Sequence, residues 1–177
     1  MKLRSTAALA ALSIVLAACG SQSAAAPTTS APAPATAESA PAQQVPAQLQ
    51  FNAKTLDGAD FAGASLAGKP AVLWFWAPWC PNCQREAPAV GRSAAANPGV
   101  TFVGVAAQDE VPAMQEFVDK YSVGGFTHLA DTDAAVWARF GITYQPAYAF
   151  VGSDGSIDVV KSGLPDAELA ERVTSLQ

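Results

Sequence analysis

The stretch WFWAPWCPNC, residues 74–83, contains two of the chain's three cysteines, with only two residues between them. It overlaps an apolar run over residues 71–77, which is typical of a strand buried on both faces of a sheet. Pro81 suits the first position of a helix, because the amide hydrogen that proline lacks has no helical partner there. The sequence therefore predicts a buried strand followed by a helix that begins next to Cys80.

A cysteine pair at this spacing can staple a turn, hold a metal or exchange electrons. A disulfide that closes so short a loop stabilises the fold by only about 2 kcal/mol. Structural zinc needs four Cys or His ligands, whereas His128 is the chain's one histidine. Redox exchange fits best, because the free amides and the dipole of a helix start favour a thiolate at Cys80. We expect Cys80 to be the nucleophile and the more exposed sulfur, Cys83 to resolve the mixed disulfide, and neither a metal nor a cofactor to take part.

The first eighteen residues predict an export signal. Lys2 and Arg4 precede a short apolar run that is followed by small residues, which is the pattern of a signal peptide rather than of a membrane span. Residues 16–19, Leu-Ala-Ala-Cys, resemble the bacterial lipobox, in which Cys19 is acylated and becomes the N-terminus after cleavage. The alternative is an ordinary signal peptide with a chance cysteine. We expect a lipoprotein signal peptide over residues 1–18 and a protein anchored by lipid to the outer face of the cell membrane.

Two further parts follow the predicted signal peptide. Residues 20–48 consist mainly of Ala, Pro, Ser, Thr and Gln, and Glu38 is their one charged residue. Such a composition buries too little apolar surface to fold. We therefore expect the acylated cysteine and a disordered tether over residues 19–48, and one compact domain over residues 49–177.

The charge of the chain excludes one class of partner. The 177 residues include 10 Lys+Arg and 15 Asp+Glu, which gives a formal net charge of −5. Binding to nucleic acid requires clustered positive charge that replaces counterions along the phosphate backbone. We therefore expect no nucleic-acid partner.

Strands and helices alternate in the predicted domain and end in a hairpin and a helix. The expected strands cover residues 49–55, 71–77, 101–107, 127–130, 147–151 and 157–161. The expected helices run from Cys80 to about residue 97 and over residues 111–121, 133–140 and 166–176. Asp166 is expected to cap the last helix, and Trp74 and Trp76 to point to opposite faces of their strand. This order implies an α/β fold with a central mixed β-sheet and helices on both faces.

Residues 76–83, WAPWCPNC, resemble the active site of the thioredoxin superfamily. The order of elements over residues 49–177 resembles its extracytoplasmic TlpA/ResA/DsbE branch, which carries an extra helix and strand before the last hairpin. With the lipobox added, the chain is most similar to the DsbE/DsbF-type lipoproteins of mycobacteria and their relatives. The resemblance implies a thioredoxin-like fold.

The resemblance also implies roles for single residues. Pro146 matches the cis-proline that faces the disulfide and presents backbone to a substrate strand. Glu86 matches the acidic residue that several members place just after the second cysteine. Thioredoxins have a buried Asp six residues before the first cysteine, where this chain has Trp74, so Glu86 is the nearest substitute for accepting the proton of Cys83.

Three further residues have both a functional and a structural interpretation. Trp79, next to the nucleophile, is expected to be a partly exposed substrate contact. Pro81 supports the site between the cysteines, and the pair Pro81-Asn82 is neither that of cytoplasmic thioredoxin nor that of the oxidant DsbA, so it predicts no particular reduction potential. His128 lies among strand residues, and we expect it to be structural.

The expected function is that of an enzyme, an extracytoplasmic thiol–disulfide oxidoreductase with a Cys-Pro-Asn-Cys active site. Its partners would be exported Cys-containing proteins and a membrane redox partner that recycles it. Resemblance to the mycobacterial proteins implies oxidation of substrates, whereas resemblance to the cytochrome c maturation branch implies reduction of an apocytochrome.

Two other functions stay open. A thiol peroxidase of the redoxin type shares the fold, but peroxiredoxins need Thr or Ser where Ala77 stands. An SCO-type copper-delivery protein spaces its cysteines by three residues and adds a downstream histidine, for which His128 is available.

Overall fold

The computed structural model of the protein describes residues 44–177. The predicted signal peptide, Cys19 and nearly all of the predicted tether lie outside these residues. Within them, no helix combines the length and the apolar character needed to cross a membrane.

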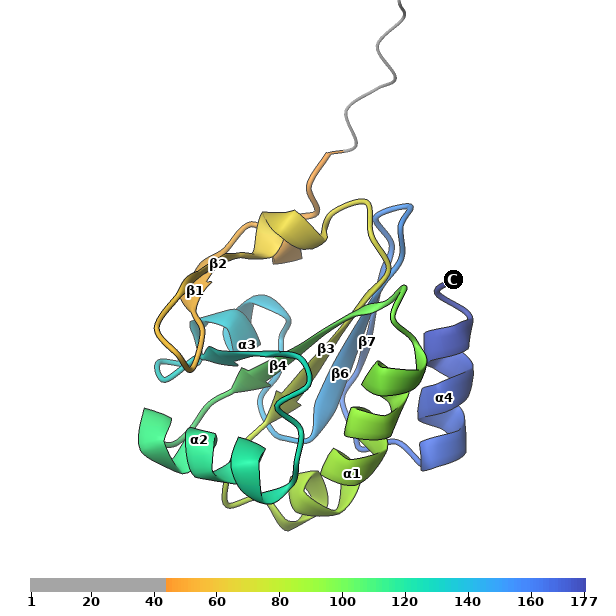
Figure 1. Cartoon of the computed structure of the whole chain (residues 1–177). Helices are drawn as coiled ribbons and strands as arrows, with labels where there is room; N and C mark the ends of the chain where they lie inside the picture. Colours follow the sequence, from red (N-terminus) through yellow and green to blue (C-terminus); the bar gives the residue numbers. More distant parts are fainter. Residues whose placement is uncertain (1–43) are drawn as a thin grey trace, which may run out of the picture. The chain divides into compact units, whose positions relative to one another are not determined.

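A five-stranded mixed sheet forms the centre of the domain, in the order β5-β4-β3-β6-β7 (Figure 1). β3 pairs in parallel with β4 and antiparallel with β6, so it is the central strand. All six of its residues are buried, as its apolar sequence predicts. The strands are β3 (Ala71–Trp76), β4 (Thr101–Ala106), β5 (Thr127–Ala130), β6 (Ala147–Val151) and β7 (Ile157–Val160).

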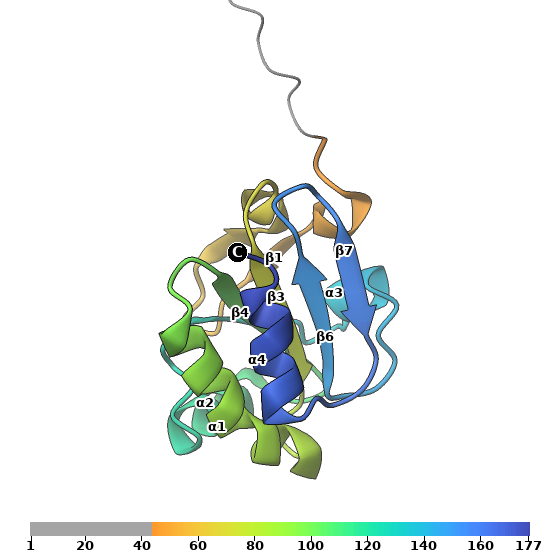
Figure 2. The ribbon, with the colours of Figure 1, turned by 90° about the vertical axis from the view of Figure 1, so that its right-hand side faces the viewer.

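Helices cover both faces of this sheet, as predicted. One hydrophobic cluster joins the sheet to three helices, and a second cluster joins its other face to α3 and the two 3-10 helices. Figure 2 shows α1 and α4 next to each other on the first face. The helices of the first cluster are α1 (Pro81–Ala96), α2 (Val111–Lys120) and α4 (Asp166–Thr174), and those of the second are η1 (Ala47–Leu49), η2 (Gly63–Leu66) and α3 (Ala135–Arg139).

The segment predicted as one strand over residues 49–55 differs in the structure. η1 ends at Leu49, and the shorter β1 (Asn52–Lys54) pairs with β2 (Asp60–Ala62) in a separate two-stranded sheet. Leu49 and Phe51 are both buried, so their alternation imitates a strand although the Leu49 amide closes a tight turn onto Pro46. The other predicted elements agree with the structure to within two residues at each end.

The prediction that Trp74 and Trp76 point to opposite faces of their strand is wrong. Residues two apart in a strand share a face, and the two indole rings lie 5.7 Å apart in the same cluster. Trp76 also stacks on Phe117 of α2 at a centroid distance of 4.2 Å. This aromatic stack fixes α2 against the strand that leads to the cysteines.

The prediction that Asp166 caps the last helix is wrong by one residue. The N-cap of α4 is Pro165, and no side chain caps it. Asp166 is instead the first helical residue and forms an exposed ion pair with Arg92 of α1, with 2.9 Å between Oδ2 and Nη2. Its charge still lies in the first turn, where the helix dipole favours it.

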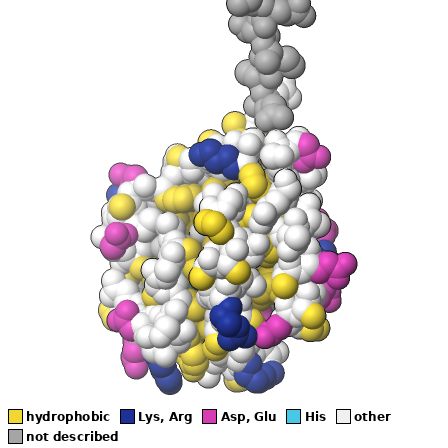
Figure 3. Space-filling model, turned by 45° about the vertical axis from the view of Figure 1, so that its right-hand side comes forward, with side chains coloured by type: hydrophobic (Ala, Val, Ile, Leu, Met, Phe, Trp, Pro, Cys, Tyr) yellow, Lys and Arg dark blue, Asp and Glu magenta, His cyan; other side chains and the backbone are white. Residues whose placement is uncertain are grey.

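Charged side chains are dispersed over the surface that Figure 3 presents. Lys and Arg appear there at separate places, between acidic groups. This face therefore has no continuous basic stripe of the kind that follows a phosphate backbone.

Candidate active site

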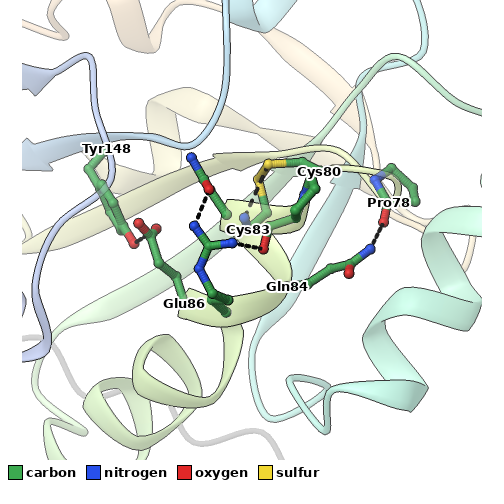
Figure 4. Close-up of a disulfide and its surroundings, with 9 residues drawn as sticks. Pro78, Cys80, Cys83, Gln84, Glu86 and Tyr148 are labelled. Carbon is green, nitrogen blue, oxygen red and sulfur yellow. Dashed lines mark hydrogen bonds between the residues drawn. A yellow bond between two sulfur atoms is a disulfide. The ribbon is translucent and has the colours of Figure 1, made fainter.

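Cys80 and Cys83 form a disulfide at the start of α1 (Figure 4). The central strand β3 ends four residues before Cys80, which is the N-cap of α1, and Pro81 occupies the first helical turn as predicted. The buried strand fixes one side of the turn, and the packed helix fixes the other. The two sulfurs therefore have a rigid support at the end of the central strand.

The two sulfurs differ in environment. The Cys83 amide, one of the groups that a helix start leaves free, donates a hydrogen bond to Cys80 Sγ at 3.1 Å. Cys80 is 3% exposed and Cys83 is 0% exposed, so Cys80 is the more accessible one, as predicted. The arrangement can stabilise negative charge on Cys80 and makes Cys80 the cysteine that an attacking thiolate reaches more readily.

Arg85 braces the first turn that carries the cysteines. Its guanidinium donates hydrogen bonds to the Pro81 carbonyl, at 3.3 Å, and to the Asn82 side chain. It brings a positive charge to the two residues between the cysteines, where the charge adds to the positive end of the helix dipole. Arg85 is not among the predicted site residues, because an exposed helical arginine has no distinctive pattern.

Pro146 lies at the same end of the sheet as the disulfide. The Gln145–Pro146 peptide bond is cis, which confirms the prediction. Ala147 pairs with Phe75 of β3, so Pro146 is level with the residues that lead from β3 to Cys80.

The Glu86 carboxyl lies between α1 and β6 and is half-buried. It accepts a hydrogen bond of 2.6 Å from the hydroxyl of Tyr148 (Figure 4). Burial raises the pKa of Glu86 above its usual value, although the Tyr148 hydrogen bond, the Leu164 backbone and the Arg85 charge act in the opposite direction. This carboxyl can therefore hold a proton more readily than an exposed glutamate.

A glycine makes room for that carboxyl. A Cβ on Gly163 would lie 2.0 Å from Glu86 Oε1 and 3.3 Å from Pro146 Cγ. The carboxyl thus lies beside the cis-proline. Sequence reasoning identified Glu86 and Pro146 but missed Gly163 and Tyr148, because a tyrosine in an apolar strand is indistinguishable from an ordinary core residue.

Two large aromatic side chains are exposed on the segments that lead to Cys80 and to Pro146. Trp79, next to Cys80, is 52% exposed, and Tyr144, two residues before Pro146, is 55% exposed. The Trp79 indole donates a 3.1 Å hydrogen bond to the Gln108 carbonyl, and the Tyr144 hydroxyl donates to the Lys161 carbonyl. Both rings are thus held in place by backbone groups although they face solvent.

One small pocket adjoins this site. A pocket of about 230 Å³ adjoins Trp79 between the start of α1 and α2. A pocket of about 880 Å³ lies between β2, α2 and β5. The cysteines line neither pocket, but the smaller one is lined by Trp79, the neighbour of Cys80.

His128 lies on β5, two strands away from β3. It is 6% exposed, and its Nε2 hydrogen bonds the Val123 carbonyl at 2.9 Å. Burial lowers the pKa of His128 to about 4, so it is neutral at ordinary pH. Among residues 44–177, no three His, Cys, Asp or Glu side chains gather in a way that could hold a metal ion.

Comparison with known proteins finds one family match and several relatives. Residues 41–160 match the AhpC/TSA family. The soluble secreted antigen MPT53 of Mycobacterium tuberculosis and Mycobacterium bovis is 52% identical over 132 residues, which are 73% of this chain and 76% of the relative. The thiol-disulfide oxidoreductase ResA of Halalkalibacterium halodurans is 28% identical over 130 residues, 72% of this chain and 73% of that protein.

Solved structures share the fold. The structure of MTB dsbF in its mixed oxidized and reduced forms is 68% identical, with a TM-score of 0.75, and the match covers 76% of this chain and all of that one. A thiol:disulfide interchange protein of the thioredoxin family from Chlorobium tepidum is 27% identical, with a TM-score of 0.66 and coverage of 77% of this chain and 99% of that one. The similarity therefore spans the sheet and the helices that carry the disulfide.

Proposed function

The chain belongs to the AhpC/TSA family and has a thioredoxin-like fold, and we propose that it is an extracytoplasmic thiol–disulfide oxidoreductase that oxidises cysteines of exported proteins. One observation carries the proposal. The Cys80–Cys83 disulfide lies at a helix start, and the Cys83 amide donates to the Cys80 sulfur. The names of the relatives, dsbF and ResA, support the same class of reaction.

The reaction would proceed through a mixed disulfide. A substrate thiolate attacks Cys80 Sγ, the Cys80–Cys83 bond breaks, and its electron pair leaves on Cys83, which takes up a proton. A second substrate thiolate then attacks the substrate sulfur and expels Cys80 as a thiolate, which the Cys83 amide stabilises. Two electrons pass from the substrate dithiol to the protein, and a membrane redox partner would remove them.

Glu86 would supply the proton that Cys83 needs. It follows Cys83 by three residues, which places both side chains on the same face of α1. Its raised pKa allows the carboxyl to hold a proton for transfer to the leaving thiolate, directly or through one water. In the reverse direction the same carboxylate would accept the Cys83 proton.

The substrate would bind to the surface around Cys80. Trp79 would contact side chains of the substrate, and the backbone beside Pro146 would pair with an extended substrate segment. Pro81 fills the first helical position and has no amide hydrogen of its own, while the amide of Cys83 in the same turn donates to Cys80.

The reduction potential tests the direction of the reaction. We expect the Cys80–Cys83 couple, equilibrated with glutathione buffers, to have a potential near that of protein disulfide isomerase, about −180 mV. The protein should then oxidise a reduced two-cysteine peptide in stoichiometric amounts. A potential near that of thioredoxin, about −270 mV, together with reduction of an apocytochrome peptide, would instead assign it to cytochrome c maturation, the activity class implied by its resemblance to that branch.

A second candidate is a thiol peroxidase, which the family match favours. Against it, the residue three before Cys80 is the buried Ala77, which offers no hydroxyl to a bound peroxide. Hydrogen peroxide should therefore oxidise the reduced protein no faster than it oxidises an ordinary thiol.

A copper-delivery function requires a histidine near the cysteines. Stoichiometric copper binding to the reduced protein would support this function.

The lipid anchor at Cys19 is a separate proposal. The relative MPT53 is named as soluble and secreted, so the anchor has to be tested on this chain. The mature protein should partition with membranes, and Cys19→Ala should release it or leave it unprocessed. Recovery of the wild-type protein in the secreted fraction, without lipid, would contradict the anchor.

A further inference from the structure

We infer that Tyr148 is a positioning residue that holds the Glu86 carboxyl between α1 and β6 and thereby sets the pH at which Cys83 exchanges its proton. The inference rests on the proposed function and extends it by one residue. Glu86 itself follows from the resemblance, whereas nothing in the sequence pattern assigns a role to the hydroxyl of Tyr148.

The contact between the two side chains is short and one partner is immobile. The Tyr148 hydroxyl donates to Glu86 Oε2 at 2.6 Å, and the two groups point toward each other from β6 and α1 (Figure 4). Tyr148 is fully buried and its ring stacks on Phe150 at a centroid distance of 6.1 Å. Since core packing fixes the tyrosine, its hydroxyl orients the more flexible glutamate.

The other carboxyl oxygen is confined as well. Glu86 Oε1 would lie 2.0 Å from a Cβ on Gly163, so it fills the space that this glycine leaves free. Pro146 Cγ borders the same space at 3.3 Å. With Oε2 held by Tyr148 and Oε1 beside Gly163, the carboxyl has one well-defined position next to the cis-proline.

The position matters because Cys83 is sealed from solvent. Its side chain has no exposed surface, so a proton reaches or leaves its sulfur through a neighbouring group rather than through bulk water. Glu86 lies one turn further along the same face of α1. A glutamate side chain that is free to turn toward solvent would exchange a proton with the Cys83 sulfur only in some of its conformations.

Charges from each packed element act on this carboxyl. Arg85 on α1 favours its ionised form and Asp166 on α4 disfavours it, while burial raises its pKa most of all. The hydrogen bond from Tyr148 on β6 favours the ionised form. The pKa of Tyr148 is itself raised by burial and by Glu86, so its hydroxyl keeps its proton and acts as a donor throughout the working range.

The resolving step isolates the effect of Tyr148. In it, Cys83 gives its proton to the Glu86 carboxylate, and the Cys83 thiolate attacks Cys80 Sγ. The Cys80–Cys83 bond forms, and the glutathione bound to Cys80 leaves as a thiolate.

To measure this step, a mixed disulfide between Cys80 and glutathione is prepared in acid, and release of glutathione is followed after a jump to pH values from 4 to 9. The rate should rise with pH as Glu86 ionises.

Tyr148→Phe keeps the stacked ring and removes the donor. Without the donor, the ionised form of Glu86 is less favourable, so the midpoint of the pH profile should move up by about one unit, as is common on loss of one hydrogen bond to a charged group. A variant that folds with an unchanged midpoint would overturn the inference, because lost packing alone slows the reaction equally at every pH.

Two further variants complete the test. Glu86→Gln should remove the Glu86-dependent limb of the profile, and adding Tyr148→Phe to it should then cause no further shift. Gly163→Ala, which pushes the carboxyl from its place while it leaves Tyr148 intact, should also displace the midpoint, and an unchanged profile there would contradict the confinement. If the wild-type protein releases glutathione at no pH, the proposed function itself is wrong, which is a different result from an unshifted midpoint.

Discussion

The backbone amide of Cys83 donates a hydrogen bond to the sulfur of Cys80 across 3.1 Å. The donor and acceptor belong to the two residues that form the disulfide. The two sulfurs are chemically alike, but this hydrogen bond gives them different environments. A negative charge on Cys80 gains this hydrogen bond together with the dipole of α1. Among the described residues no group donates a hydrogen bond to Cys83 Sγ, and Cys83 is also the more deeply buried of the two.

This inequality predicts different behaviour for two serine variants. Cys83→Ser should trap a covalent complex with substrate through Cys80, because no second thiol remains nearby to resolve it. Cys80→Ser should trap little and lose activity by roughly 10³-fold or more, as is usual when a nucleophile is removed. Non-reducing gels with a reduced two-cysteine substrate distinguish the two, and alkylation of the reduced wild type should modify Cys80 first. Stable complexes from Cys80→Ser would reverse the assignment of the nucleophile.

Local features of this site could be predicted from the sequence, because each depends on a few neighbouring residues. The apolar run of β3 and Pro81 at the start of α1 follow from short patterns, the cis bond before Pro146 follows from the resemblance to the thioredoxin superfamily, and the structure contains all three. The hydrogen bond between Tyr148 and Glu86 joins residues 62 positions apart. No pattern in a single sequence indicates which carboxyl a core tyrosine meets.

Two of the wrong predictions have different origins. Trp74 and Trp76 share a face because strands repeat every two residues, so the error there was one of geometry. The segment over residues 49–55, which begins where η1 ends, alternates like a strand because Leu49 and Phe51 both reach the core. Tertiary burial, rather than the local conformation, produced that alternation.

Trp79 predicts a specific loss of substrate affinity. Trp79→Ala should raise KM for a cysteine-containing peptide about fivefold, because an exposed aromatic contact contributes about 1 kcal/mol to binding. The reaction with a small thiol that does not reach the ring should keep its rate. Trp79→Phe is the matched control, because it retains an aromatic ring but loses the hydrogen bond to the Gln108 carbonyl. Its KM should lie between those of the wild type and Trp79→Ala. An equal loss with the small thiol would show that Trp79 supports the disulfide instead of contacting the substrate.

Alanine substitutions at Gly104 on β4 and at Gly91 on α1 should change the free energy of unfolding in opposite directions. A Cβ at Gly104 would lie 2.1 Å from His128 Nδ1 and 2.8 Å from Trp76 Nε1, both in the core. Gly104→Ala should therefore cost about 1–3 kcal/mol of unfolding free energy through overpacking. A Cβ at Gly91 would meet its nearest neighbour at 3.6 Å, so Gly91→Ala should add about 0.5–1 kcal/mol through helix propensity. Urea unfolding of both variants measures the difference, and equal effects would contradict the close packing around Gly104.

His128 predicts how stability changes with pH. Burial lowers the pKa of His128 from its usual value of 6.5 to about 4 in the folded protein, so between these values the unfolded chain binds the additional proton. The contribution of neutral His128 to stability is therefore complete above pH 6.5 and declines as the pH falls toward 4. The full loss corresponds to about 3 kcal/mol of unfolding free energy, and urea unfolding at pH 7, 5.5 and 4 measures it.

His128→Gln separates this effect from the titration of carboxyl groups, which also occurs near pH 4. Glutamine carries an amide that can still donate to the Val123 carbonyl, the partner of His128 Nε2, but it does not titrate. Because the wild type and the variant share every other titrating group, the difference in their unfolding free energies should change by about 3 kcal/mol between pH 7 and pH 4. A difference that stays constant over this range would mean that His128 is protonated equally in the folded and unfolded chains, and that water or a counter-charge reaches its ring in solution.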